Sequence, residues 1–146
     1  MSVRQIDVFF YGLLMDEEVL RQAGAAPSHL RRAYVRDFAL RIGHRASLIA
    51  SPGARACGML IALTHAELER LYNAPGLELY RPEPVVAQLL EGGTVAALCY
   101  NLVQAPEPHE WNLEYAKRLQ NVLGELGFPA EYVESITRRP GVDRAQ

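Results

Sequence analysis

Short runs of β-branched and aromatic residues recur along the chain and predict five or six β-strands, because such residues favour a pleated, half-buried surface. The first run, Ile6 to Tyr11, meets Gly12, which predicts a strand that ends in a turn. The predicted strands cover residues 6–11, 33–42, 47–50, 57–63, 84–90 and 94–103. Ser51-Pro52-Gly53 predicts a turn that closes the third strand, and Glu91-Gly92-Gly93 predicts a hairpin between the last two.

Helix signals occur at four other places. Acidic residues after the first strand suit the positive end of a helix and predict a helix over residues 16–24. Thr64 and Glu67 have the spacing of a capping box, which predicts a helix over residues 64–72. Apolar residues three and four apart predict a helix over residues 110–126, and Pro129 suits the first position of a last helix that ends near Ile136.

The order of these elements predicts the fold class. The strands are not separated by regular crossover helices, which argues against a doubly wound parallel sheet. We expect an α+β fold with a mixed, partly closed β-sheet or barrel and a few short helices. At 146 residues the chain has the length of one domain, which we place at residues 1–136, with a polar tail at residues 137–146.

Composition and charge exclude several classes of function. The formal net charge of −2 and the absence of a basic footprint argue against nucleic-acid binding. The short cluster Arg31, Arg32 and Arg36 is better explained as a solvated edge than as a phosphate site. No run reaches the 18 or so apolar residues of a membrane helix, and charges near the N-terminus interrupt any signal peptide.

The two cysteines, Cys57 and Cys99, lie in apolar strand-like runs, which predicts reduced core thiols and a cytoplasmic protein. Neither has the spacing of a metal ligand, and no two of the four histidines are four residues apart. We therefore assign no metal site. A homodimer is left open.

The turn after the first strand is the first candidate site. The backbone amides of Gly12, Leu13 and Leu14 lead into an acidic helix start, where successive amides can form a concavity for an anion. Spacing alone favours a plain strand-to-helix turn.

The second candidate is Tyr80-Arg81-Pro82-Glu83, where a phenol, a guanidinium and a carboxylate follow one another closely. Arg81 could bind a carboxylate through its forked donors, and Glu78 or Glu83 could act as a general base. Spacing alone favours a salt bridge at a rim and a packing tyrosine.

Taken together, several segments resemble the gamma-glutamylcyclotransferase-like family over about residues 8–136. Phe10-Tyr11-Gly12-Leu13-Leu14 resembles the family's Tyr-Gly-Ser-Leu signature after strand one. The middle section, the Val-rich strand after Tyr80-Arg81, and the C-terminal segment with Tyr115 and Leu126-Gly127-Phe128-Pro129 are also similar. Each motif is weak alone, but their order and spacing are fairly specific.

The resemblance implies a cofactor-free reaction. In active members the substrate's α-amine attacks its own γ-carbonyl, which gives 5-oxoproline and a free amine, and a glutamate takes the ammonium proton. The resemblance implies a small polar ligand, a gamma-glutamyl or related amide, bound by Tyr11, Gly12, Leu13, Leu14, Tyr80, Arg81 and Tyr115.

The sequence departs from the family at the glutamate that acts as the general base in active members. Alignment on Gly76 puts Pro75 at the position of the catalytic glutamate and Tyr72 at that of the motif's aspartate. Glu78 is the nearest substitute and our candidate catalytic residue, with Glu83 next. Two hypotheses therefore compete: an enzyme with a relocated carboxylate, or a non-catalytic binder of the same fold. A partner-binding role comes third. We expect ordinary cyclotransferase activity to be weak or absent.

Overall fold

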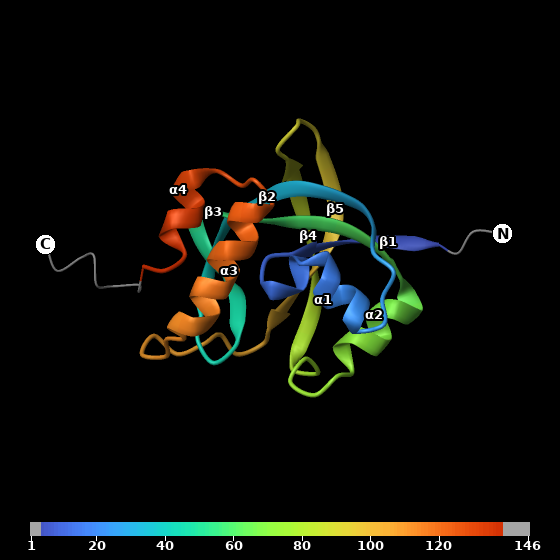
Figure 1. Ribbon diagram of the computed structural model, residues 1–146, viewed down its shortest axis with the longest axis horizontal. Helices are drawn as coiled ribbons and strands as arrows, with labels where there is room; N and C mark the ends of the chain where they lie inside the picture. The colour runs from blue at the N-terminus through green and yellow to red at the C-terminus, as the bar shows by residue number, and fades with distance from the viewer. Residues whose placement is uncertain (1–3, 139–146) are drawn as a thin grey trace, which may run out of the picture.

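In the computed structural model, which describes residues 4–138, five β-strands close into a barrel in the order β1-β3-β2-β4-β5 (Figure 1). The strands are β1 (Gln5–Phe10), β2 (Ser28–Ile42), β3 (Ala46–Thr64), β4 (Tyr80–Leu89) and β5 (Thr94–Leu102). Neighbours pair antiparallel except β1 and β5, which close the barrel in parallel where Val8 faces Leu98. The predicted α+β fold with a mixed sheet is confirmed, and the sheet closes completely.

The long β2–β3 ribbon corrects one prediction. Ser51-Pro52-Gly53 does not end a strand, because β3 runs through it from Ala46 to Thr64. The register jumps from Arg36 opposite Arg55 to Phe38 opposite Ala50, which leaves Asp37 facing four residues. Asp37 adopts φ 66°, and its carboxylate accepts a hydrogen bond from the Gly53 amide at 2.9 Å. The bulge therefore accommodates a turn-like segment inside one continuous ribbon.

The helices lie close to their predicted positions. They are α1 (Glu17–Gln22), α2 (His65–Tyr72), α3 (Leu113–Glu125) and α4 (Ala130–Ser135), and a short 3₁₀ helix, η1 (Leu13–Met15), precedes α1. The capping box before α2 is present: Thr64 Oγ1 accepts from the Glu67 amide at 3.2 Å, and Glu67 accepts from the Thr64 amide at 2.8 Å. Pro129 occupies the N-cap of α4 rather than its first helical position. The β4–β5 hairpin is also confirmed.

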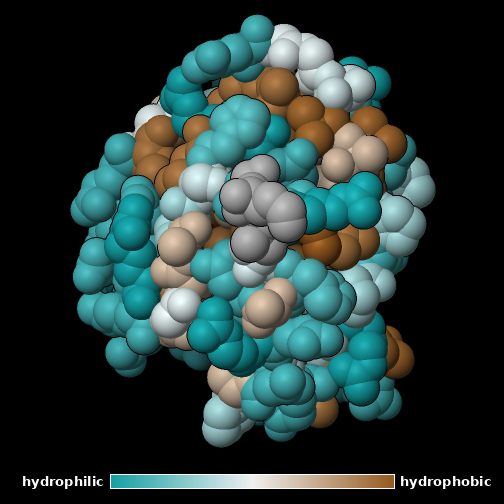
Figure 2. Space-filling model, turned by 90° about the vertical axis from the view of Figure 1, so that its right-hand side faces the viewer, coloured by the Kyte–Doolittle hydropathy of each residue, from teal (hydrophilic) through white to brown (hydrophobic). Residues whose placement is uncertain are grey.

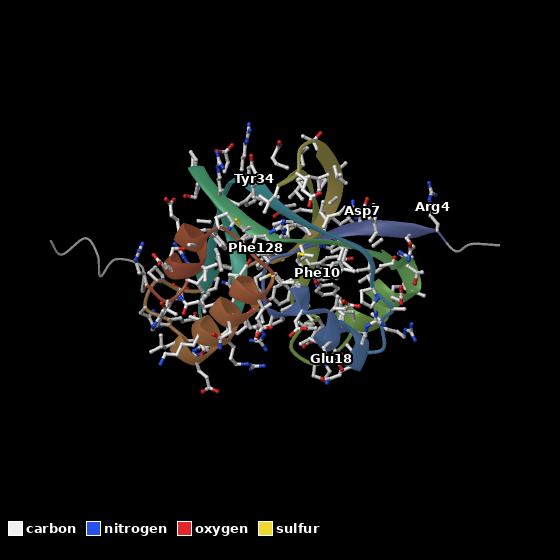
Figure 3. The ribbon with its side chains drawn as sticks, turned by 45° about the horizontal axis from the view of Figure 1, so that its top comes forward. Arg4, Asp7, Phe10, Glu18, Tyr34 and Phe128 are labelled. Carbon is white, nitrogen blue, oxygen red and sulfur yellow. The ribbon has the colours of Figure 1, made fainter. Side chains whose placement is uncertain are left out.

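The hydrophobic core fills the barrel and continues under the helices. Phe9 and Leu60 from the barrel and Leu119 from α3 are almost completely buried. In Figure 3, Phe10 lies in the interior, whereas Glu18 points outward. Figure 2 shows a mainly hydrophilic face with hydrophobic residues in patches between polar ones, as is usual for a globular surface.

The cysteines behave as predicted. Cys57 and Cys99 are unpaired and buried. Burial raises the pKa of the Cys57 thiol to about 11 and that of Cys99 to about 12, so both are neutral thiols at physiological pH. The prediction of core thiols is confirmed. Most of the predicted tail, residues 139–146, lies outside the described residues, and the domain boundary at residue 136 stays a prediction.

Candidate functional site

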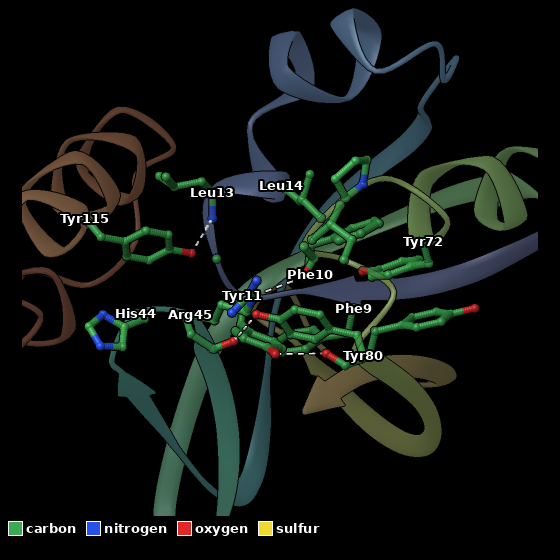
Figure 4. A pocket seen from close by; sticks show the side chains of 16 residues that line it. Phe9, Phe10, Tyr11, Leu13, Leu14, His44, Arg45, Tyr72, Tyr80 and Tyr115 are labelled. Atoms are coloured by element: carbon green, nitrogen blue, oxygen red, sulfur yellow. Dashed lines mark hydrogen bonds between the residues drawn. The ribbon is translucent and has the colours of Figure 1, made fainter. Parts of the chain in front are cut away.

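A cavity of about 290 Å³, here called the β1 cavity, opens where the chain leaves β1 (Figure 4). Two loops border it: the β1 loop, residues 11–15, and the α2 loop, residues 73–79. The cavity is lined by Phe9, Phe10, Tyr11, Gly12, Leu13, Leu14, His44, Arg45, Ala46, Tyr72, Pro75, Gly76, Leu77, Tyr80, Tyr100 and Tyr115. Aromatic side chains, five of them tyrosines, therefore dominate its walls.

Tyr115 on α3 holds the β1 loop in place. Its hydroxyl accepts a hydrogen bond from the Leu13 amide at 3.1 Å (Figure 4). A Cβ at Gly12 would lie 2.5 Å from that hydroxyl oxygen, so only glycine fits without a shift. Within residues 4–138 the amides of Gly12 and Leu14 have no hydrogen-bond partner. Two of the three amides predicted for ligand binding are thus available, and the third is committed to Tyr115.

Two other tyrosines are fixed through their hydroxyl groups. Tyr11 donates to the carbonyl of Tyr100 at 2.8 Å, and Tyr80 donates to the carbonyl of Ala46 at 2.5 Å. The rings of Tyr72 and Tyr100 stack with their centroids 3.8 Å apart. These contacts give the cavity a rigid aromatic wall.

Burial sets the protonation of the tyrosines. Desolvation is the largest cause that raises the pKa of Tyr11, Tyr72, Tyr80, Tyr100 and Tyr115 above the usual value near 10. All five are therefore neutral phenols at physiological pH, and none can serve as a phenolate base.

Arg45 is the only permanently charged side chain among the sixteen lining residues, all of which the structure describes. It lies in the turn between β2 and β3, and its Nε donates to the carbonyl of Gly76 in the α2 loop at 3.1 Å. His44 lies at the rim with its side chain 85% exposed, and its Nε2 is 4.0 Å from the Glu110 carboxylate. No aspartate or glutamate belongs to the lining.

The structure brings together six of the eight residues predicted for the site. Tyr11, Gly12, Leu13, Leu14, Tyr80 and Tyr115 all line the β1 cavity. Glu78 and Arg81 do not: the Glu78 side chain is exposed, and Arg81 Nη1 donates to the carbonyls of Glu78 and Tyr80. Glu83 also lies outside the lining and accepts a hydrogen bond from Asn101.

Sequence reasoning missed Arg45, Tyr72 and Tyr100 as lining residues. Each comes from a different part of the chain, and only the closure of the barrel brings them together. No local sequence signal marks Arg45, because its place in the lining depends on the turn after β2 lying beside the α2 loop, whose Gly76 carbonyl it contacts.

Among residues 4–138, no three His, Cys, Asp or Glu side chains gather closely enough to hold a metal ion. None of the described helices has the length and apolar character needed to cross a membrane.

Comparison with known proteins identifies the family. The sequence profile of the family described as gamma-glutamyl cyclotransferase, AIG2-like, matches residues 8–117, which is more than half of the chain. The chain belongs to this family, in agreement with the resemblance found in the sequence. No curated protein matches the chain significantly.

Solved structures agree with this fold. A structure named gamma-glutamyl cyclotransferase has a TM-score of 0.75 at 22% identity, over 93% of this chain and 88% of that one. An uncharacterized protein from Homo sapiens has a TM-score of 0.73 at 23% identity, over 92% of this chain and 88% of that one. YkqA from Bacillus subtilis has a TM-score of 0.75 at 23% identity, over 92% of this chain but 54% of its own. At these identities the likeness shows the fold alone.

Proposed function

We propose that this chain binds a small polar ligand in the β1 cavity, and that its cyclotransferase activity is weak or absent. One observation carries the proposal: a fixed aromatic cavity with unpaired backbone amides remains beside β1, but no carboxylate lines it. Ligand sites are commonly concave and largely apolar, with a few polar groups that fix orientation.

The missing carboxylate matters because of the reaction that the family resemblance implies. The attacking amine of a gamma-glutamyl compound is an ammonium at neutral pH and must lose a proton first. Pro75 lines the cavity at the position aligned with the family's glutamate, and proline offers no side-chain acceptor. The tyrosines are neutral phenols, and the His44 side chain is largely exposed at the rim. A missing base typically costs about 10²–10⁴ in rate.

The relocated-carboxylate alternative receives little support from the geometry. The Glu78 side chain is exposed. The loop around it is held by two hydrogen bonds: Arg81 donates to the Glu78 carbonyl, and the Leu77 amide donates to the Ala74 carbonyl at 3.0 Å. Glu83 is paired with Asn101. Neither carboxylate belongs to the lining of the cavity.

The partner-binding alternative requires an exposed apolar patch over the cavity mouth. Leu79 is 49% exposed and Val103 80% exposed, but both border the neighbouring groove and neither lines the β1 cavity. This supports ligand binding over partner binding. The cytoplasmic location and the homodimer stay predictions.

The test combines turnover with binding. Purified protein is incubated with gamma-glutamyl-alanine, and release of 5-oxoproline is followed by chromatography. Ligand-observed NMR on the same samples reports binding of the compound to the protein. We expect binding of at least one small carboxylate or amide with no 5-oxoproline above the uncatalysed background. Turnover at ordinary enzymatic rates of about 1–10³ s⁻¹ would overturn the loss of activity, and absence of binding for every probe would overturn the binding role.

A further inference from the structure

Several hydrogen-bond donors of the residues that line the β1 cavity have no acceptor among the described residues. Arg45 uses Nε for the Gly76 carbonyl, and among the described residues no acceptor bonds its two Nη groups. The Gly12 and Leu14 amides are likewise unpaired within residues 4–138, and the Tyr72 hydroxyl has no hydrogen-bond partner there. Arg45, two amides and a phenol therefore offer donors to the same small volume.

Anionic acceptors are missing from the same walls. No carboxylate belongs to the lining, so its acceptors are neutral, as are the phenol oxygens of Tyr11 and Tyr80, whose hydrogens go to backbone carbonyls. An ammonium in this cavity would lose water without gaining an anionic partner, and the Arg45 guanidinium would repel it. The faces of the aromatic rings can also attract a cation, but the stacking of Tyr72 on Tyr100 covers one face of each of these two rings.

From this inventory we propose that the cavity selects a small carboxylate whose neighbouring nitrogen is uncharged, with Arg45 as the residue that binds the carboxylate. The inference rests on the proposed function and adds the chemical class of the ligand. Amino acids that are acylated on nitrogen fit this class: the carboxylate faces the guanidinium, and the acyl oxygen accepts from the free amides of the β1 loop. Free amino acids and gamma-glutamyl compounds, which carry an ammonium, do not.

The volume of the β1 cavity and its aromatic walls favour a ligand with an apolar side chain. The cavity holds about 290 Å³, and its walls carry Phe9, Phe10 and five tyrosine rings. An aromatic side chain buries a large apolar area and packs favourably against other rings. N-acetyl-L-phenylalanine therefore combines the three required features in one probe.

Three probes separate those features. N-acetyl-L-phenylalanine has the carboxylate without the ammonium, L-phenylalanine has both, and N-acetyl-L-phenylalaninamide has neither. Their dissociation constants are measured by calorimetry or NMR titration on the full chain. We expect N-acetyl-L-phenylalanine to bind at least about tenfold more tightly than either of the others, because charge-assisted hydrogen bonds are roughly twice as strong as neutral ones.

Variants assign the effect to Arg45. Arg45→Gln should weaken binding of N-acetyl-L-phenylalanine at least about tenfold and leave that of its amide nearly unchanged, whereas Arg45→Lys should lie in between, because lysine keeps the charge but loses the fork. Arg36→Gln is the matched control, since Arg36 is exposed on β2 and does not line the cavity. Thermal unfolding of each variant verifies that it folds.

The outcomes separate this inference from the proposed function. Equal or tighter binding of L-phenylalanine or gamma-glutamyl-alanine overturns the ligand class but leaves a binding cavity. Binding of N-acetyl-L-phenylalanine that is unchanged in Arg45→Gln overturns the role of Arg45. Failure of all these compounds to bind the wild-type chain overturns both the inference and the proposed function.

Discussion

The two loops that border the β1 cavity are built in different ways. The β1 loop is fixed by distant parts of the chain: Tyr115, 102 positions away, accepts from Leu13 and packs against Gly12. The α2 loop is fixed mainly by its own turns, in which the Leu77 amide donates to Ala74 at 3.0 Å and the Tyr80 amide to Leu77 at 3.1 Å.

This difference indicates how a family fold can keep a cavity while its chemistry changes. Gly12 in the β1 loop cannot gain a side chain without disturbing Tyr115 of α3. In the α2 loop most hydrogen bonds are local, apart from the one that Arg45 donates to the Gly76 carbonyl, so the side chain of Pro75 can be replaced with little effect elsewhere. The resemblance found in the sequence aligns Pro75, in the second loop, with the family's glutamate, and Leu13, in the first loop, with the serine of its signature. Function resides in such loops, and the scaffold does not fix it.

Returning a carboxylate to the α2 loop should have the largest effect. Pro75→Glu puts an acceptor into the lining, and we expect 5-oxoproline release from gamma-glutamyl-alanine to rise by up to about 10² over the wild-type chain. Pro75→Gln, which has nearly the same shape without the charge, is the control. Equal rates for the two variants would contradict the proposal that a missing base at this position limits activity.

The β1 loop should tolerate almost no change at Gly12. A methyl group there would lie 2.5 Å from the Tyr115 hydroxyl oxygen but 3.8 Å from its Cζ. Gly12→Ala should lower the free energy of unfolding by about 1–3 kcal/mol, as overpacking does. In a Tyr115→Phe background the same substitution should cost clearly less, because the clashing oxygen is gone. Urea unfolding of the four proteins tests this, and identical costs in both backgrounds would contradict the contact.

A smaller effect is expected where the α2 loop joins β4. Tyr80→Phe removes the hydrogen bond to the Ala46 carbonyl and should cost about 0.5–1.5 kcal/mol of stability. It should also weaken ligand binding, since Ala46 adjoins Arg45 in the cavity wall. Urea midpoints and probe titrations measure both. A stability equal to that of the wild type would mean that the hydroxyl has an equivalent partner in water.

The smallest effect should come from Glu78→Gln. The Glu78 side chain is exposed and outside the lining, so its replacement should change stability by less than about 0.5 kcal/mol. Any residual 5-oxoproline release should be unchanged as well. A large loss of release would show that the α2 loop rearranges and that Glu78 is the base after all.

Sequence patterns predicted the elements whose signals are local. The capping box of Thr64 and Glu67 and the Gly92-Gly93 hairpin lie within a few residues of the structure they specify. The continuity of β3 was missed because it depends on Asp37, which adopts a positive φ and bonds Gly53 across the ribbon. No local signal reveals that pairing.

The residues of the candidate site likewise divide into those with a sequence signal and those without one. The β1 loop could be predicted because Gly12 follows a strand directly, Tyr80 belonged to the second candidate cluster, and Tyr115 came from the family resemblance. Arg45 could not be predicted, because its role depends on the contact with Gly76, which barrel closure creates. Arg81, adjacent to Tyr80, lies outside the lining because successive residues of a strand point to opposite faces.

The hydrogen bond between Leu13 and Tyr115 also has a consequence for biosynthesis. During translation the β1 loop leaves the ribosome about 100 residues before the helix that holds it, and β1 must likewise wait for β5 to close the barrel beside it. The cavity is therefore finished among the last parts of the nascent chain, after long-range loop closure. A ligand of this cavity binds only a chain synthesised past α3, so its binding can report completed folding in chains stalled at successive lengths.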